Sequence, residues 1–328
     1  MRRREFIAGL GSAAAWPVVA PGQQSAMPTI AFLHTGPRDA PGATFILAAF
    51  RRGLAESGYA EGRNLAIEYR YANDRMERLP ELAADLVRVP LAAIVVISTA
   101  AVVALKEART PIPVVFSIGT DPVRLGVVAS LNRPGGNFTG IYNLNNTVAA
   151  KRLEVLREIV PTATSIAHLV NPANPAFGET ETRELAAAAR IFGINLMVLH
   201  VTNPSELEPA FAAMVRDRVG GVVVGGDALF IDLRNDIVTL AARHRVPALY
   251  PWSVATAAGG LASYGTDFEE SFRLAGVYAA RLLKGEKPAD FPVQQVTKMQ
   301  LAINMNTAKA LGLTFPIAIL GRADHAFE

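Results

Sequence analysis

The side chains that could do chemistry in this sequence are mostly neutral hydrogen-bonding and aromatic residues that follow short apolar runs. Each run is typical of a buried strand in a parallel sheet, because it is rich in valine, isoleucine and alanine and is bounded by turn residues. In open sheets of this kind, ligands bind beyond the carboxyl ends of the strands. The sequence therefore predicts a ligand-binding site formed by His34, Thr35, Ser98, Thr99, Ser117, Asp121, Tyr142, Asn143, Asn171, Asn174, Asp227, Tyr250, Trp252 and Tyr264.

Some of these residues suit a ligand with opposite charges at its two ends. Ser98 and Thr99 precede a predicted helix at 100–108, and their hydroxyls and the free amides of its first turn favour a carboxylate. Asp121 and Asp227 follow other strands, and each could receive an ammonium group. Helix capping is the alternative explanation for all four residues.

The other members of the set offer aromatic surface and neutral hydrogen bonds. Trp252 would supply a stacking surface beyond a strand end, although core packing explains a tryptophan there equally well. His34 could contact the ligand, with a structural or solvated role as its alternative. A cleft lined in this way suits a small amphipathic molecule.

The sequence lacks the motifs on which catalytic and metal sites commonly depend. It has no G-x-S-x-G, H-E-x-x-H or G-x-x-x-x-G-K-[ST] motif, no paired histidines at metal-ligand spacing, and no cysteine. Glu179 and Glu181 lie two residues apart on a predicted helix and point to different sides, so we interpret them as part of a solvated face. The sequence thus predicts a binding protein, with no catalytic residue, metal or cofactor.

Strand-like and helix-like segments alternate from residue 27 onward. The predicted strands lie at 29–33, 64–69, 92–97, 114–116, 139–142, 165–170, 195–199, 221–224, 248–250 and 261–264. The predicted helices lie at 44–57, 76–87, 100–108, 148–159, 179–192, 204–216, 233–244 and 269–283. This alternation predicts parallel sheets with helices on both faces.

A weak internal repeat favours two similar lobes. Residues 86–99 align on residues 214–227 without a gap, and residues 112–116 resemble residues 246–250 in the same order. Each stretch contains a helix end, a buried strand and then a polar residue. The length of 328 residues also fits two domains.

The composition excludes two classes of protein. Hydrophobic residues make up 51% of the chain and charged residues 19%, which excludes a disordered chain. Three arginines and one glutamate lie in the first twenty residues, so the net charge falls from +3 for the whole chain to +1 without them. A nearly neutral body does not indicate a nucleic-acid partner.

Residues 1–20 have the pattern of an export signal, MRRREFIAGLGSAAAWPVVA. A basic start precedes an apolar stretch that is rich in small residues and too short to span a bilayer permanently. The residues RREFI at 3–7 also resemble the twin-arginine motif, and both the twin-arginine and the general secretory routes remain open. Without a cysteine for a lipid anchor, we expect the mature chain to be free in a periplasm and not embedded in the membrane.

A series of motifs runs in order along almost the whole mature chain. The motifs are FRRGLAESGYAEGRN at 50–64, EYRY at 68–71, DPVRLG at 121–126, LNRPGGNFTG at 131–140, KRLE at 151–154, VNPANP at 170–175, SYG at 263–265 and NMNTAKALG at 304–312. With them, the chain resembles the periplasmic substrate-binding proteins of ABC importers, in the branch that includes tryptophan- and tyrosine-binding members.

The resemblance implies an α/β fold with two Rossmann-like lobes and parallel sheets, the type I periplasmic-binding or Venus flytrap architecture. The first lobe would comprise residues 28–140 and 266–288, and the second lobe residues 141–265 and 289–328. Three crossing segments would connect the lobes, near 140–143, 263–267 and 287–293.

The resemblance also implies a function. The protein would capture a small organic ligand, an aromatic or other amphipathic amino or carboxylic acid, between the lobes and deliver it to an ABC permease in the inner membrane. A ligand carboxylate is expected at Ser98 and Thr99, with Asp121, Tyr142 and Asn143 along the crossover. Asp227 is the candidate partner of an ammonium group.

Two other classes of protein remain as alternatives. One is a secreted α/β enzyme acting on a small polar substrate, for which the sequence shows no nucleophile–base motif. The other is the effector domain of a transcriptional regulator, which would need a DNA-binding helix-turn-helix where this chain has an export signal.

Overall fold

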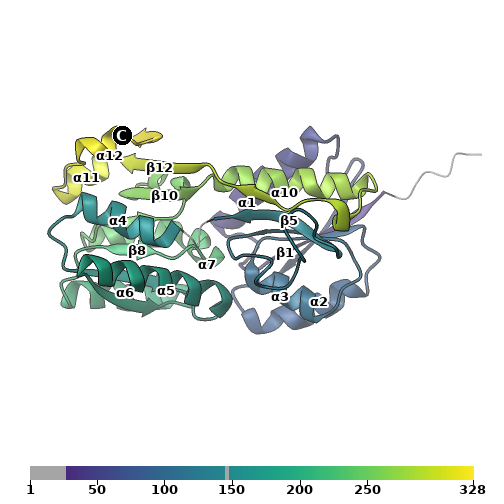
Figure 1. Cartoon of the computed structure of the whole chain (residues 1–328), viewed down its shortest axis with the longest axis horizontal. Helices are drawn as coiled ribbons and strands as arrows, with labels where there is room; N and C mark the ends of the chain where they lie inside the picture. Colours follow the sequence, from purple (N-terminus) through teal and green to yellow (C-terminus); the bar gives the residue numbers. More distant parts are fainter. Residues whose placement is uncertain (1–26, 145–147) are drawn as a thin grey trace, which may run out of the picture.

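The apolar runs of the sequence form the central strands of two sheets, each covered by helices on both faces. The computed structural model describes residues 27–144 and 148–328, and Figure 1 shows two α/β lobes that lie end to end. Every predicted strand corresponds to a strand of the structure, so the two-lobed architecture with mostly parallel sheets is confirmed. Within the described residues, no helix combines the length and the apolar character needed to cross a membrane.

The first lobe is built on a six-stranded parallel sheet with the order β11-β5-β4-β3-β1-β2. Alternate strand residues face opposite sides, so Phe32 and Val95 pack toward α1 and α10 while Leu33 and Val96 pack toward α2 and α3. The elements are β1 (Thr29–His34), α1 (Pro41–Glu56), β2 (Ala66–Tyr71), α2 (Leu79–Val87), β3 (Ala93–Val96), α3 (Thr99–Glu107), β4 (Val114–Ile118), β5 (Phe138–Asn143), α10 (Phe268–Leu283) and β11 (Gln294–Val296).

The second lobe contains a seven-stranded sheet with the order β13-β12-β10-β9-β8-β6-β7. Its pairings are parallel except that β12 runs antiparallel to β10. The elements are α4 (Ala149–Ile159), β6 (Ser165–Val170), α5 (Pro175–Phe192), β7 (Asn195–His200), α6 (Leu207–Arg216), β8 (Val222–Val224), α7 (Ala228–Asp232), α8 (Arg234–Arg243), β9 (Ala248–Tyr250), α9 (Ser253–Ala257), β10 (Ala262–Thr266), β12 (Met299–Asn304), α11 (Met305–Leu311), α12 (Ile317–Leu320) and β13 (His325–Phe327).

Two of the predicted lobe boundaries need correction. The strand β5 lies in the first sheet as far as Asn143, so residues 141–143 belong with the first lobe and not the second. The strand β11 pairs with β5 in the same sheet, although residues 289–328 were all assigned to the second lobe. Only three residues long and mostly exposed, β11 carries no apolar pattern that the sequence could reveal. The chain therefore crosses between sheets at residues 297–298.

The helices α1 and α10 approach each other closely at two glycines on one face of the first sheet. A Cβ atom on Gly53 would lie 1.8 Å from the carbonyl oxygen of Arg273, and one on Gly276 would lie 2.1 Å from the carbonyl oxygen of Phe50. No side chain can occupy either space while the helices keep this distance. The two glycines therefore fix α10, which follows a crossover, against the body of the first lobe.

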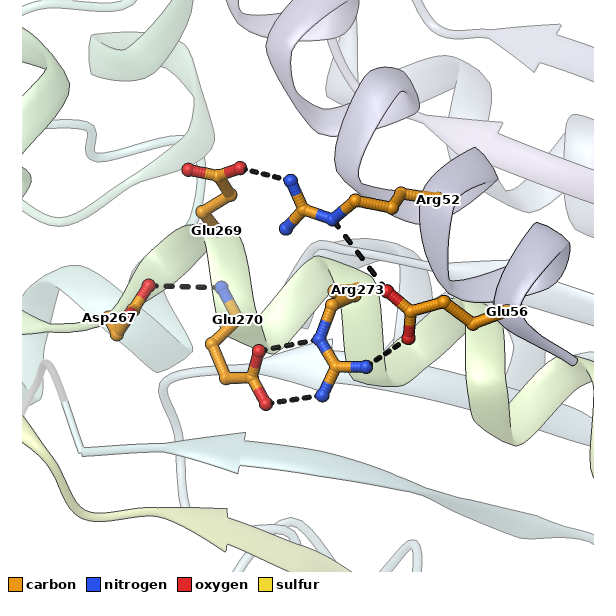
Figure 2. Close-up of polar contacts among 6 residues, drawn as sticks. All are labelled: Arg52, Glu56, Asp267, Glu269, Glu270 and Arg273. Carbon is orange, nitrogen blue, oxygen red and sulfur yellow. Dashed lines mark hydrogen bonds and ion pairs between the residues drawn. The ribbon is translucent and has the colours of Figure 1, made fainter.

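An exposed network of charged side chains spans the same two helices (Figure 2). Arg52 of α1 pairs with Glu269 at 2.6 Å, and Arg273 of α10 bonds both Glu270 and Glu56. Exposed pairs of this kind contribute little stability, about 0–1 kcal/mol each. The ion pairs connect the exposed sides of the two helices, whereas the glycine contact sets the distance between the helices.

We expect Gly53→Ala to destabilise the first lobe by about 1–3 kcal/mol or more, because the added methyl group must separate two helix backbones. The measurement is the free energy of unfolding in urea. Gly136→Ala is the matched control, since a Cβ atom there meets no atom within 4 Å. Equal stability of the two variants would show that the helices can separate at little cost.

Candidate functional site

A cavity lies between the two lobes at the carboxyl ends of their strands. The first lobe contributes Ser98, Thr99, Ser117 and Asn143 to its lining, and the second lobe contributes Asn174 and Asp227. All six are members of the set that the sequence predicted. The strand-end rule thus brings these residues together from both lobes, as expected for parallel sheets that face each other.

The first-lobe side of the cavity is formed by the start of α3 and by the end of β4. Ser98 occupies the N-cap position of α3, but its side chain makes no capping hydrogen bond. The Thr99 hydroxyl lies 3.1 Å from that of Thr120, and the buried Ser117 hydroxyl and Asn143 amide oxygen have no hydrogen-bond partner. Buried polar atoms are normally paired, so this wall has hydrogen-bonding capacity for a ligand group. The α3 first-turn amides make a carboxylate the best-matched group.

The second-lobe side of the cavity centres on the Asp227 carboxylate. It accepts hydrogen bonds from the Leu229 amide at 3.0 Å, the Asn171 side chain at 2.9 Å and the Asn174 side chain at 2.6 Å. Asp227 therefore caps α7, which is the structural alternative that the sequence left open. It also lines the cavity, as a ligand-binding residue would. Burial raises its pKa, while the three donors oppose that rise. All three donors are neutral, so an ionised Asp227 retains its negative charge for a cationic ligand group.

An apolar wall completes the cavity, and the sequence did not reveal it. Its side chains are Ile46, Ile97, Phe177, Ile231, Phe268 and Phe272. Phe268 packs edge-on against Phe272 with ring centroids 4.7 Å apart. In the sequence these residues are indistinguishable from core positions of helices. Together with the two polar sides, they suit a ligand with a carboxylate, an ammonium group and an apolar side chain.

Several predicted residues lie outside this cavity lining. Asp121 and Tyr142 line an outer groove at the mouth between the lobes, where Asp121 accepts hydrogen bonds from the amides of Val123 and Arg124. That groove also contains Arg183 and Glu184 of the second lobe, and it shares Gly119 with the cavity.

The remaining predicted residues are buried or packed in the lobes. Asn171 holds Asp227, and Tyr250 and Trp252 belong to the hydrophobic core, with Trp252 5.4 Å from the Phe268 ring. Tyr264 packs against the core of the second lobe. His34 and Thr35 are buried at the end of β1.

His34 is held as a neutral ring. Its Nδ1 atom accepts a hydrogen bond from the Gly36 amide at 2.8 Å, and burial lowers its pKa to about 4. Among the residues that the structure describes, no three histidine, aspartate or glutamate side chains are placed to hold a metal ion together.

A buried ion pair supports the Asp227 loop, and here the interpretation of Glu181 as a solvated residue is wrong. Glu181 is 1% exposed, and its carboxylate lies 2.5 Å from Arg152, which is fully buried. The same carboxylate accepts the Gly226 amide at 3.0 Å, next to Asp227, while Arg152 donates to the Tyr264 carbonyl at 3.0 Å. Of the two glutamates that we interpreted as a solvated face, only Glu179 is exposed. The pair therefore connects α4, α5 and β10 with the ligand-facing loop.

We expect Arg152→Met to destabilise the protein by about 3–5 kcal/mol, because it leaves the Glu181 carboxylate buried without its partner. The double variant Arg152→Met/Glu181→Met should recover most of this loss. Urea unfolding measures both. Lys151→Met is the matched control, since the neighbouring Lys151–Glu154 pair is exposed and should contribute less than about 1 kcal/mol. An equal loss in the single and double variants would contradict this role of the pair.

The chain is similar to known proteins over most of its length. The family model described as ABC transporter substrate binding protein matches residues 38–327. The tyrosine-binding protein of Clostridioides difficile (strain R20291) is 26% identical over 264 residues, which cover 80% of this chain and 75% of that protein.

Two solved structures share the architecture at similar identity. A conserved domain protein from Vibrio cholerae superposes with a TM-score of 0.82 and 26% identity, covering 92% of this chain and 99% of its own. The ABC domain from Streptococcus pneumonia in complex with L-Trp gives a TM-score of 0.78 and 25% identity, covering 91% and 100%.

Proposed function

The chain belongs to the family of ABC transporter substrate-binding proteins, and from this premise we propose that it captures an aromatic L-amino acid between its lobes. A protein of this family binds a solute and presents it to an ABC permease. The tyrosine-binding relative and the L-Trp complex support an aromatic amino acid as the ligand class. The partners are thus the small ligand and, transiently, a permease in the inner membrane.

One arrangement carries the proposal: a carboxylate-binding wall and an unneutralised carboxylate face each other across one cavity from different lobes. The ligand carboxylate would lie at the start of α3, against Ser98, Thr99 and Ser117. The ligand ammonium would lie against Asp227, and the aromatic side chain against Phe268 and Phe272. A zwitterion with an apolar side chain matches all three sides.

Capture follows from this placement without any chemical step. A ligand that touches only one lobe has no preference between the open and closed forms. One that touches both lobes stabilises the closed form by the contacts it gains there. The charge pair with Asp227 forms in a site removed from water, where it is stronger than at the surface.

We expect L-tryptophan, L-tyrosine or L-phenylalanine to raise the melting temperature of the mature protein, and myo-inositol to have no effect. Asp227→Asn should weaken binding of the best of these amino acids by about tenfold to a hundredfold, because a hydrogen bond to a charged group contributes about 1.5–3 kcal/mol. Binding of the analogue that lacks only the amino group should change little. Isothermal titration calorimetry measures both affinities.

Asp121→Asn is the matched control, since Asp121 caps a turn in the outer groove and does not line the cavity. An equal loss of affinity for the amino acid and for its des-amino analogue would count against Asp227 as the ammonium partner. If no amino acid stabilises the protein and turnover of a small substrate is measured instead, the function is that of a secreted enzyme.

We also propose that the chain acts in the periplasm, with residues 1–20 as its export signal. These residues lie outside the described part of the structure, so the support comes from the sequence and from the family. Removal of residues 2–20 should retain the protein in the cytoplasm, as judged by cell fractionation. Changing Arg3 and Arg4 to lysine should block export by the twin-arginine route and leave general secretion unaffected. Export of the truncated chain would contradict the assignment.

A further inference from the structure

A carboxyl group of the second lobe is inserted between two glycines of the first lobe. Asp232, the last residue of α7, is 6% exposed, and neither of its carboxyl oxygens has a well-aligned hydrogen-bond partner, although the Ala43 amide at the start of α1 approaches the carboxyl group. A Cβ atom on Gly36 would lie 2.0 Å from its Oδ2 atom, and a Cβ atom on Gly42 would lie 2.1 Å from its Oδ1 atom. We call Gly36 and Gly42 the glycine notch. A side chain at either glycine would require the Asp232 carboxyl to move out of the notch.

The notch lies at the start of α1, a helix whose N-terminus is not capped from within its own lobe. Ala40 occupies the N-cap position without a side-chain hydrogen bond, Pro41 follows, and the first turn holds no acidic residue. The free amides there carry partial positive charge, and the Ala43 amide acts on the Asp232 carboxyl by lowering its pKa. Arg234, two residues further along, donates to the Pro41 carbonyl at 3.4 Å. Figure 1 places α7 at the junction of the lobes.

The groups that face Asp232 come from both lobes and include two other carboxyl groups and one arginine. Asp74 of the first lobe and Asp227 of the second oppose its ionisation, while Arg234 and the Ala43 amide favour it. Burial is the largest effect and, with these neighbours, raises the pKa of Asp232 to about 8. Burial and Asp227 likewise raise the pKa of Asp74 to about 6. His34, whose ring also lies beside Gly36, is neutral at these pH values.

We propose that Asp232 is a positioning residue for ligand capture: it enters the glycine notch only as the lobes close, and this docking sets how readily they close. Asp232 does not line the ligand cavity, so it acts through the lobes and not on the ligand. The role of Asp232 in ligand capture rests on the proposed function. The docking itself is a property of the ligand-free protein and is tested there.

A dependence of closure on pH follows from the docking. In the open form Asp232 is returned to water and has an ordinary pKa of about 4. Its pKa is higher in the closed form, so closing binds a proton between about pH 4 and pH 8. The closed form is therefore favoured at low pH and loses this advantage as the pH rises toward 8. The pKa values of Asp74 and His34, about 6 and about 4, lie below the interval from pH 6.5 to 8.5. Burial also raises the pKa of Asp227, so the Asp232→Asn variant separates the contribution of Asp232 from that of Asp227.

The first experiment measures closure without ligand. The chain has no cysteine, so Arg124→Cys/Glu184→Cys places two spin labels across the mouth of the cleft, where both residues line the outer groove. Electron–electron spin distances should show a larger closed population at pH 6.5 than at pH 8.5. Asp232→Asn, which stays uncharged, should remove most of this difference. Gly42→Ala should shift the distances toward the open value at both pH values, because the Asp232 carboxyl must leave its place in the notch.

Gly136→Ala is the control for the glycine change, because a Cβ atom there meets nothing. Gly42→Ala should leave the unfolding of the labelled protein in urea unchanged or slightly improved, since alanine suits a helix better than glycine. This result would separate a defect in closure from a defect in folding. A closed population that responds neither to pH nor to Gly42→Ala would overturn the proposal.

The second experiment uses L-tryptophan as the probe. Its affinity for the native sequence should fall about tenfold from pH 6.5 to pH 8.5, less than the limit of tenfold per pH unit for one fully coupled proton. Asp232→Asn should show a nearly constant affinity, and Gly42→Ala a lower affinity than the native sequence at pH 6.5 with a smaller change toward pH 8.5. If L-tryptophan does not bind but the ligand-free distances change as expected, the ligand assignment fails and the docking role stands. A native affinity that is constant over this interval contradicts the role in capture.

Discussion

The arrangement of the two lobes in this structure is constrained above all by carboxyl groups that lie near their junction without ion-pair partners. Asp74, Asp227 and Asp232 all have raised pKa values, each mainly through burial. Asp227 further raises the pKa of both Asp74 and Asp232, and Asp74 further raises that of Asp232. The described residues offer none of the three an ion pair within 4 Å. In an open form these groups would regain water. Closure of the empty protein is therefore opposed by desolvation, and a proton or a cationic ligand group must offset it.

Charged side chains inside each lobe have ion-pair partners, whereas the carboxyl groups near the junction of the lobes do not. Arg152 and Glu181 are fully buried but paired with each other and hydrogen-bonded to the backbone at Tyr264 and Gly226. The network across α1 and α10 remains in contact with water (Figure 2). Several buried atoms without partners, among them those of Ser117, Asn143 and Asn174, lie instead where the lobes meet. An interface that holds unpaired polar atoms has hydrogen-bonding capacity for a ligand and is suited to closing on one.

The sequence could predict the polar part of the site because parallel strands end on one side of their sheet. That rule located Ser98 and Asp227 from residue order alone, but it says nothing about which way a side chain turns after the strand. Trp252 satisfies the rule and still packs in the core. Glu181 could not be recognised, because its partner Arg152 lies 29 residues away and the two meet only through the packing of α4 on α5. Asp232 was missed because it lies a helix beyond its strand.

Ligand and proton act on the same group of carboxyls, so their effects on closure are linked. Part of the rise in the pKa of Asp74 and Asp232 comes from the charge of Asp227. An ammonium group beside Asp227 would cancel that part and make its neighbours easier to ionise. Burial, which is the larger cause, would remain, so the liganded cleft would still favour a proton on Asp232. In the proposed capture, a cationic ligand group and a proton would therefore occupy different carboxyls of one cluster, and together they would let the closed form bury the cluster at little cost.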